Sequence, residues 1–212
     1  GIGGQLINWP EHLIDFLLKN NFRPIVYDNR DTGLSSRIPS DSFSDAKRDN
    51  TIVKNYIRYY LRLPIKSDYT LDDMAVDGIS VLDKLDIPEA HILGISMGGM
   101  IAQIIASSHP KRTKTFTLIA STASTPSPFN GPTRKVRKLL MDRTKNPNST
   151  IDERVARSRK IFTEIGYQGI DLNTEEFYNN VSTSIERGGK DDTGFGRQLN
   201  AILASQNRID KV

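Results

Sequence analysis

The 212-residue sequence contains no cysteine and only three histidines. Without cysteine the chain cannot form a disulfide, a thiolate metal site or a cysteine nucleophile, and this composition is typical of proteins in a reducing compartment. We therefore expect a cytoplasmic protein. Because histidine is so scarce, a role for it as a general base can be considered at each of its three positions in turn.

Long apolar runs are also absent. The longest, residues 92–106, is interrupted by Ser96 and Gln103 and is shorter than the roughly 20 residues needed to cross a bilayer. The chain begins at Gly1 without a charged segment followed by an apolar one, so no signal peptide is recognisable and we expect the natural start to lie upstream. These features predict a soluble protein without membrane insertion.

Neither sign of charge dominates the sequence. Lysine and arginine total 29 and aspartate and glutamate total 25, which gives a formal net charge of +4. The most basic stretch, residues 134–160, contains interspersed acids but no aromatic residues of the kind that line a nucleic-acid stacking groove. We interpret it as the exposed faces of amphipathic helices, with an anion-binding patch as the alternative, and we expect no nucleic-acid partner.

Hydrophobic periodicity predicts an alternation of helices and short apolar strands over the first 120 residues. We expect helices at 10–20, 52–61, 70–85 and 97–108, and strands at 24–27, 91–95 and 115–120. The first strand is expected to be buried and to lead into a polar turn. Strands separated by helices form parallel sheets, so this order predicts an α/β fold with a mainly parallel sheet flanked by helices.

Beyond residue 120 only helical patterns follow, at 133–144, 151–165, 174–186 and 196–205. A helical block inserted after the third visible strand is typical of a cap over the carboxyl ends of the strands, where open α/β sheets bind ligands. We therefore divide the chain into a core (1–124), a helical cap or lid (125–207) and a return to the core that starts within 208–212.

The segment Gly94-Ile95-Ser96-Met97-Gly98 matches the pattern G-x-S-x-G between a predicted strand and a predicted helix. In that context the serine lies on a sharp turn, exposed to a general base, and the turn has room only for small neighbours, hence Gly94 and Gly98. A helix that begins at Met97 directs its free amides and its positive dipole end toward a developing oxyanion. The motif predicts that Ser96 is a nucleophile.

Three further segments make the pattern more specific. They are Gly1 to Gly4 with Trp9 beyond, the loop Asp28-Asn29-Arg30-Asp31-Thr32-Gly33-Leu34-Ser35, and the helix start Tyr69 to Ala75. Together with Gly94 to Gly99 they resemble the α/β-hydrolase superfamily of the serine-esterase type, and within it the aclacinomycin methylesterase-like group. The resemblance covers nearly the whole chain.

The resemblance implies a role for each matching position. Ser96 would attack an ester carbonyl, and the backbone amides of Met97 and Ile2 would form the oxyanion hole. The glycines of the turn, including Gly99, would be structural. Asp28, Arg30 and Asp31 would brace their loop through salt bridges, and Gly33 would occupy a positive-φ turn position. No metal or organic cofactor is expected.

The general base and the triad acid are not recognisable in the chain. His109 is thirteen residues beyond Ser96, His91 precedes it along a strand and His12 lies in the first helix, so none is placed to act as the base. Residues 121–124 offer no carboxylate. We expect a chain truncated at both ends, whose acid and histidine lie elsewhere in a longer parent and whose isolated form is inactive.

The leading hypothesis is a serine hydrolase in which Ser96 hydrolyses a carboxylic ester of a small, partly apolar molecule through an acyl-enzyme. Carbon–carbon bond hydrolysis, acyl transfer and perhydrolysis on the same serine remain open, as does a non-catalytic binding protein. The cap would set the substrate, and its aromatic residues are candidates for an apolar wall. They are Phe162, Tyr167, Phe177, Tyr178 and Phe195. The sequence leaves the oligomeric state open.

Overall fold

The computed structural model describes residues 1–38, 54–125, 131–145, 149–188 and 193–211. The chain forms two compact units. The first unit contains Gly1–Gly3, Ile38–Gly131 and Phe195–Val212, and the second contains Gly4–Arg37 and Pro132–Gly194. The domain borders expected at 124/125 and 207/208 remain predictions. Parts of the predicted segments lie outside the described residues: 52 and 53 of a helix, 126–130, 146–148 and 189–192 of the cap, and 212 of the return to the core.

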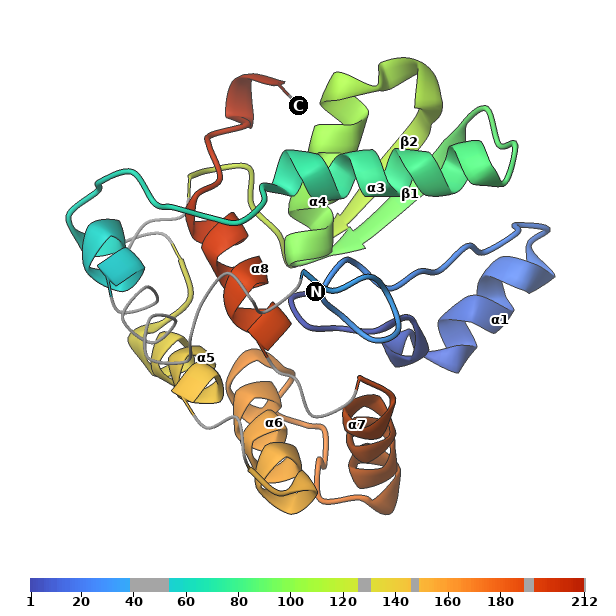
Figure 1. Cartoon of the computed structure of the whole chain (residues 1–212). Coiled ribbons are helices and arrows are strands. Elements are labelled where there is room, and N and C mark those ends of the chain that lie inside the picture. The colour runs from blue at the N-terminus through green and yellow to red at the C-terminus, as the bar shows by residue number, and fades with distance from the viewer. Residues whose placement is uncertain (39–53, 126–130, 146–148, 189–192, 212) are drawn as a thin grey trace. The chain divides into compact units, whose positions relative to one another are not determined.

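A β-α-β motif forms the centre of the first unit. Strand β1 (Ala90–Ile95) pairs in parallel with β2 (Thr113–Ile119), and helix α4 (Met97–Ser108) connects them through the short 3-10 turn η3 (Pro110–Arg112). Helix α3 (Leu71–Lys84) packs against α4 (Figure 1). This arrangement confirms the predicted parallel α/β fold, and α4 has the predicted bounds.

Local sequence explains where α3 begins. The Thr70 hydroxyl accepts a hydrogen bond from the Asp73 amide at 3.1 Å, and the Asp73 carboxylate accepts one from the Thr70 amide at 2.7 Å. This reciprocal pair forms a capping box and satisfies two amide groups that helix geometry leaves unpaired. Beyond the cap, apolar residues recur every three or four positions and give α3 one buried face.

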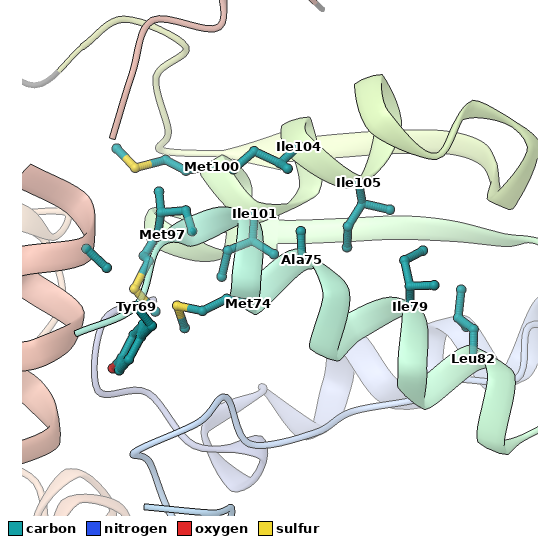
Figure 2. Close-up of a cluster of buried hydrophobic side chains, with 12 residues drawn as sticks. Tyr69, Met74, Ala75, Ile79, Leu82, Met97, Met100, Ile101, Ile104 and Ile105 are labelled. Carbon is teal, nitrogen blue, oxygen red and sulfur yellow. The ribbon is translucent and has the colours of Figure 1, made fainter. Parts of the chain in front are cut away.

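That buried face forms the core of the first unit. In Figure 2, Ala75 of α3 and Ile101 and Ile105 of α4 lie between the two helices, and Tyr69 lies beside Met74. Met74 and Met97 are fully buried, and Leu71 and Ala75 are 1% exposed. The same buried cluster includes three isoleucines of α4, namely Ile101, Ile104 and Ile105. Because α4 also contacts both strands, this core fixes the strand-to-helix turn that carries Ser96.

The segment 24–27 was predicted to be a buried strand, and that prediction is wrong. In the described part of the chain these residues carry no strand assignment, and Val26 is 38% exposed. A β-strand needs a partner that accepts and donates its backbone hydrogen bonds, and the described sheet contains only β1 and β2. Apolar and β-branched composition alone therefore did not determine the state of this segment.

The remaining helices follow the predicted pattern. The second unit contains η1 (Leu6–Asn8), α1 (Glu11–Lys19), α5 (Arg134–Lys145), α6 (Ile151–Ile165) and α7 (Glu175–Gly188). The C-terminal part of the first unit contains η4 (Ile209–Lys211) and all of α8 (Thr193–Leu203) from Phe195 onward. Residues 54–60 are helical as well. A Thr150–Glu153 capping box begins α6. Across the described ranges, every helix falls short of the length and apolarity that a membrane span needs.

Replacing Met74 by alanine tests the core. Met74 is fully buried at the centre of the α3–α4 contact, so Met74→Ala removes buried apolar area and leaves a cavity. We expect the free energy of unfolding, measured by urea denaturation, to fall by about 2–5 kcal/mol. Val76, on the same helix, is 55% exposed, so Val76→Ala should change it by less than about 0.5 kcal/mol. Equal effects of the two changes would contradict the assigned core.

Candidate active site

Ser96 lies at the turn between β1 and α4, where its backbone adopts φ 53° and ψ −118°. A residue with a Cβ atom rarely occupies this region, and doing so costs about 1–3 kcal/mol. The Ser96 amide donates to the Ile119 carbonyl at 2.9 Å, which extends the parallel ladder to the first residue beyond β1. The strained turn therefore starts directly at the end of a paired strand.

Three hydrogen bonds converge on the Ser96 carbonyl oxygen. It accepts from the Gly99 amide at 2.9 Å, from the Met100 amide at 3.2 Å and from the Ser121 hydroxyl at 2.8 Å. The first two come from the opening turn of α4, and the third comes from Ser121, the second residue after β2. The surrounding structure thus holds Ser96 from both sides, which is the condition for a strained conformation to persist.

The glycines of the motif differ in how much they are needed. A Cβ atom added at Gly94 would overlap the Gly98 backbone, and one added at Gly99 would lie 2.5 Å from the Cβ of Ser121. At Gly98, by contrast, an added Cβ would have no described atom within 4 Å. The expectation that the turn requires a small residue at both Gly94 and Gly98 is thus wrong for Gly98, because its Cα hydrogen points into open space rather than at the strand.

The predicted oxyanion donors both belong to the first unit. Gly1 lies beside the nucleophile, since a Cβ built on it would be 3.6 Å from the Ser96 Cβ. Ile2 follows directly, and Met97 is the first residue of α4, where an amide has no partner inside the helix. Among the described residues, neither the Ile2 amide nor the Met97 amide donates a hydrogen bond to another group. Both are free to donate to a ligand.

A buried arginine holds the segment after β2 against α4. Arg208 is 4% exposed, and its Nε donates to Gln103 Oε1 of α4 at 3.1 Å. Its Nη2 donates to the Thr122 carbonyl at 3.1 Å, and its backbone amide donates to the Ala123 carbonyl at 2.8 Å. Burial lowers the pKa of the guanidinium, an effect that the Asp72 carboxylate partly offsets. These contacts fix the chain next to Ser121, which in turn contacts Ser96.

No imidazole of the first unit reaches Ser96. His91 Nδ1 is 2.8 Å from the Thr115 hydroxyl across the β1–β2 pair, about 16 Å back along the strand. His109 is the C-cap of α4, about 18 Å from the end that carries Ser96. Within the described residues the Ser96 hydroxyl makes no hydrogen bond. The predicted nucleophile is thus positioned, but no general base contacts it here.

The loop 28–35 is organised around Asp28 within the second unit. Its side chain is 4% exposed and pairs with Arg187 of α7 at 2.7 Å. The carboxylate also accepts from the Leu6 amide at 2.8 Å and from the Leu34 amide at 3.0 Å. Gly33 has φ 56°, and a Cβ atom there would overlap the Asp28 carboxylate, so the turn needs glycine for two independent reasons.

The bracing role predicted for Arg30 and Asp31, the other charged residues of this loop, stays a prediction. Asp31 is 4% exposed, has φ 65° and donates its amide to the Ser36 carbonyl at 2.9 Å. Arg30 is half-buried. The second unit contains the predicted loop residues Asp28, Arg30, Asp31 and Gly33. The first unit contains the predicted nucleophile and oxyanion donors, Ser96, Met97 and Ile2.

The aromatic residues proposed for an apolar wall do not all belong to one unit. Phe162 of α6 and Phe177 of α7 form an edge-to-face pair in the second unit with ring centroids 5.9 Å apart. Tyr167 is 79% exposed, and the Tyr178 hydroxyl donates to Asp152 at 2.7 Å, a contact that raises the pKa of Tyr178. Phe195 is 4% exposed and belongs to the first unit.

Comparison with known proteins connects this geometry to a family. The family model described as "alpha/beta hydrolase fold" matches residues 1–204. The chain belongs to the α/β hydrolase family. It is 26% identical over 192 residues to the rhodomycin D methylesterase DnrP of Streptomyces peucetius, an alignment that covers 82% of this chain and 56% of that protein. The putative carbamate hydrolase RutD of Pseudomonas syringae pv. syringae is 26% identical over 141 residues, covering 66% of this chain and 43% of the relative.

Solved α/β hydrolase structures resemble the chain in fold. A carboxylesterase from Nitrososphaera gargenis gives a TM-score of 0.65 at 18% identity, covering 98% of this chain and 63% of that one. The enol-lactonase of Burkholderia xenovorans gives a TM-score of 0.59 at 20% identity, covering 98% of this chain and 64% of that one. The chain thus spans a little over half the length of the methylesterases and about two thirds of these solved structures.

Several residues that shape the site were not found from the sequence. Ser121 contacts the Ser96 carbonyl, Arg208 holds the residues after Ser121, and Gln198 bonds to the glycine-rich N-terminal segment. Each lies between 25 and 195 residues from its partner, so no local pattern marks it. The local sequence does not distinguish Gln198 either, because the polar residues Arg197 and Asn200 lie beside it in α8.

Two matched glycine substitutions test the turn. Gly94→Ala should prevent the turn from forming, because the new methyl group overlaps the Gly98 backbone, whereas Gly98→Ala enters open space. We expect Gly94→Ala to lower the free energy of unfolding by more than about 2 kcal/mol and Gly98→Ala to change it by less than about 1 kcal/mol, measured by urea denaturation. A reversed order would show that the turn is built differently.

Two ion pairs of the second unit form a second matched test. Asp28→Ala leaves the Arg187 guanidinium, 19% exposed, without its buried partner, and we expect a loss of about 3–5 kcal/mol in the free energy of unfolding. Lys135 pairs with Glu164 but is 71% exposed, so Lys135→Ala should cost less than about 1 kcal/mol. Raising the salt concentration to 0.5 M should reduce the contribution to the free energy of unfolding of the exposed Lys135–Glu164 pair only. Similar losses for both variants would refute the role given to Asp28.

Proposed function

We propose that the natural protein containing this sequence is a serine hydrolase that cleaves a carboxylic ester of a small, partly apolar molecule. The observation that carries the proposal is the arrangement at Ser96. Its backbone is held at φ 53° on a strand-to-helix turn, next to two amides, those of Met97 and Ile2, that have no other described partner. An acyl-transfer site needs a presented hydroxyl and donors for an oxyanion in this relation.

The chemistry follows from these groups. The Ser96 hydroxyl loses its proton to a general base and attacks the ester carbonyl carbon, and the carbonyl oxygen becomes an oxyanion that the two amides stabilise. Collapse of this intermediate breaks the carbon–oxygen bond, the alcohol leaves with a proton from the base, and the acyl group stays on Ser96. Water then hydrolyses the acyl-enzyme by the same steps. One lost oxyanion donor typically costs about 3–4 kcal/mol of transition-state stabilisation.

We propose that the base and the acid come from residues outside positions 1–212, which would leave the isolated chain inactive. The relatives support the reaction class, since their names describe a methylesterase and a carbamate hydrolase, both of which cleave a carbonyl-to-heteroatom bond. Because the chain spans only 56% of the methylesterase, the activity of the whole protein is our proposal. We also propose a cytoplasmic location and a cap, residues 125–207, that determines the substrate.

A non-catalytic binding protein is the second candidate. The observation that favours it is the lack of any described hydrogen bond to the Ser96 hydroxyl, combined with two histidines of the first unit that lie far from it. A hydroxyl without a base is a weak nucleophile, although the free amides could still bind a carbonyl or carboxylate oxygen.

Covalent labelling separates the two candidates. We expect a fluorophosphonate to add one phosphonyl group to the natural protein, detected by intact mass, and Ser96→Ala to abolish the addition because it removes the attacking oxygen. The isolated 212-residue chain should label at least about 10³-fold more slowly because it lacks the base. If the folded natural protein stays unlabelled, the binding function is favoured.

A further inference from the structure

Gln198 of α8 reaches the glycine-rich segment at the start of the chain. Its side chain is completely buried, and its Oε1 accepts a hydrogen bond from the Gly3 amide at 2.8 Å, across 195 residues of sequence. Both residues belong to the first unit. Gln198 is also the only fully buried polar residue that α8 contributes in the described chain, since Asn200 is 7% exposed.

A buried amide in this position is costly unless it is bonded. Its neighbours on α8, Ala201 and Ile202, pack with the apolar core, so the surroundings of Gln198 supply little solvation. Leaving its oxygen unpaired would cost about 1–3 kcal/mol. The bond to Gly3 therefore helps to hold the N-terminal segment, because breaking it takes a hydrogen-bond donor away from the buried Gln198 oxygen.

The tether also determines which amide remains available. Gly3 has φ 64°, a left-handed conformation that favours glycine, and the chain turns at Ile2 and Gly3. Its N–H is taken by Gln198, whereas the Ile2 N–H has no described partner, and Gly1 lies against Ser96. Of the amides in this segment, the one left free next to the nucleophile is that of Ile2.

We propose that Gln198 is a positioning residue for the oxyanion hole: by holding the Gly3 amide it fixes the segment so that the Ile2 amide is directed toward Ser96. This inference rests on the proposed serine-hydrolase function and adds to it a residue that does not touch the substrate. Gln198 holds the segment through the Gly3 amide, so we expect its effect on the oxyanion hole to fall on the transition state, in which the oxyanion forms, rather than on ground-state binding.

Steady-state kinetics of the natural protein on p-nitrophenyl acetate test the proposal. Loss of an oxyanion donor lowers kcat by about 10²–10³-fold, so Gln198→Leu, which only misplaces one donor, should lower kcat by about 10–100-fold with KM within about threefold. Asn200→Leu is the matched control, because it removes another buried amide of α8, one that accepts from Asn55 Nδ2 at 3.1 Å. It should reduce stability but change kcat by less than about threefold.

A pH profile adds a readout that a purely structural role would not change. Gln198→Glu retains an oxygen that can accept from Gly3, so while its carboxyl is protonated the variant should keep a kcat within about fivefold of the wild type. As pH rises and the carboxyl ionises, its negative charge near the forming oxyanion should lower kcat relative to the wild type. The ratio of the two kcat values should therefore fall with increasing pH.

The outcomes distinguish the two levels of the proposal. A wild-type protein that hydrolyses the ester and is labelled at Ser96, with equal kcat losses in Gln198→Leu and Asn200→Leu, would overturn the positioning role and leave the proposed function intact. A wild-type protein with neither hydrolysis nor labelling would overturn the function and, with it, this inference. A selective kcat loss in Gln198→Leu together with the pH-dependent ratio for Gln198→Glu supports both.

Discussion

The backbone of Ser96 is held at φ 53° and ψ −118°, and the rest of the first unit is arranged around this turn. Such a conformation costs free energy, so it persists only where neighbouring contacts leave the chain no alternative. Here the β1–β2 ladder reaches Ser96 on one side through the Ile119 carbonyl, and the first turn of α4 and Ser121 hold its own carbonyl on the other. The apolar α3–α4 core then keeps α4 in place (Figure 2).

Buried polar groups supply the remaining constraints on the first unit. Arg208 connects α4 with the segment after β2, and Gln198 connects α8 with the N-terminal glycines. Each contact joins parts of the chain that are distant in sequence, and each involves a buried side chain, so breaking it carries a desolvation cost. In the second unit the Asp28–Arg187 pair has the same character, since it joins the loop after residue 27 to α7.

Much of the fold was predictable because it rests on local signals. The bounds of α4 follow from its apolar run and the G-x-S-x-G turn, and those of α3 and α6 follow from capping boxes at Thr70 and Thr150. The segment 24–27 was misjudged because strand formation depends on a pairing partner that composition does not reveal. Gly98 was misjudged because a motif gives residue types but not the direction of each Cα hydrogen.

The candidate site was predictable only in its local part. Ser96, Met97 and the glycine-rich start could be identified from consecutive residues, whereas Ser121, Gln198 and Arg208 act through contacts across 25 to 195 positions.

The most direct test of the account is a crystal structure of the natural protein after reaction with a fluorophosphonate. We predict the phosphorus on Ser96 Oγ and one phosphonyl oxygen about 3 Å from the amide nitrogens of both Met97 and Ile2. A phosphonyl oxygen that points to solvent, or a label on another residue, would contradict it.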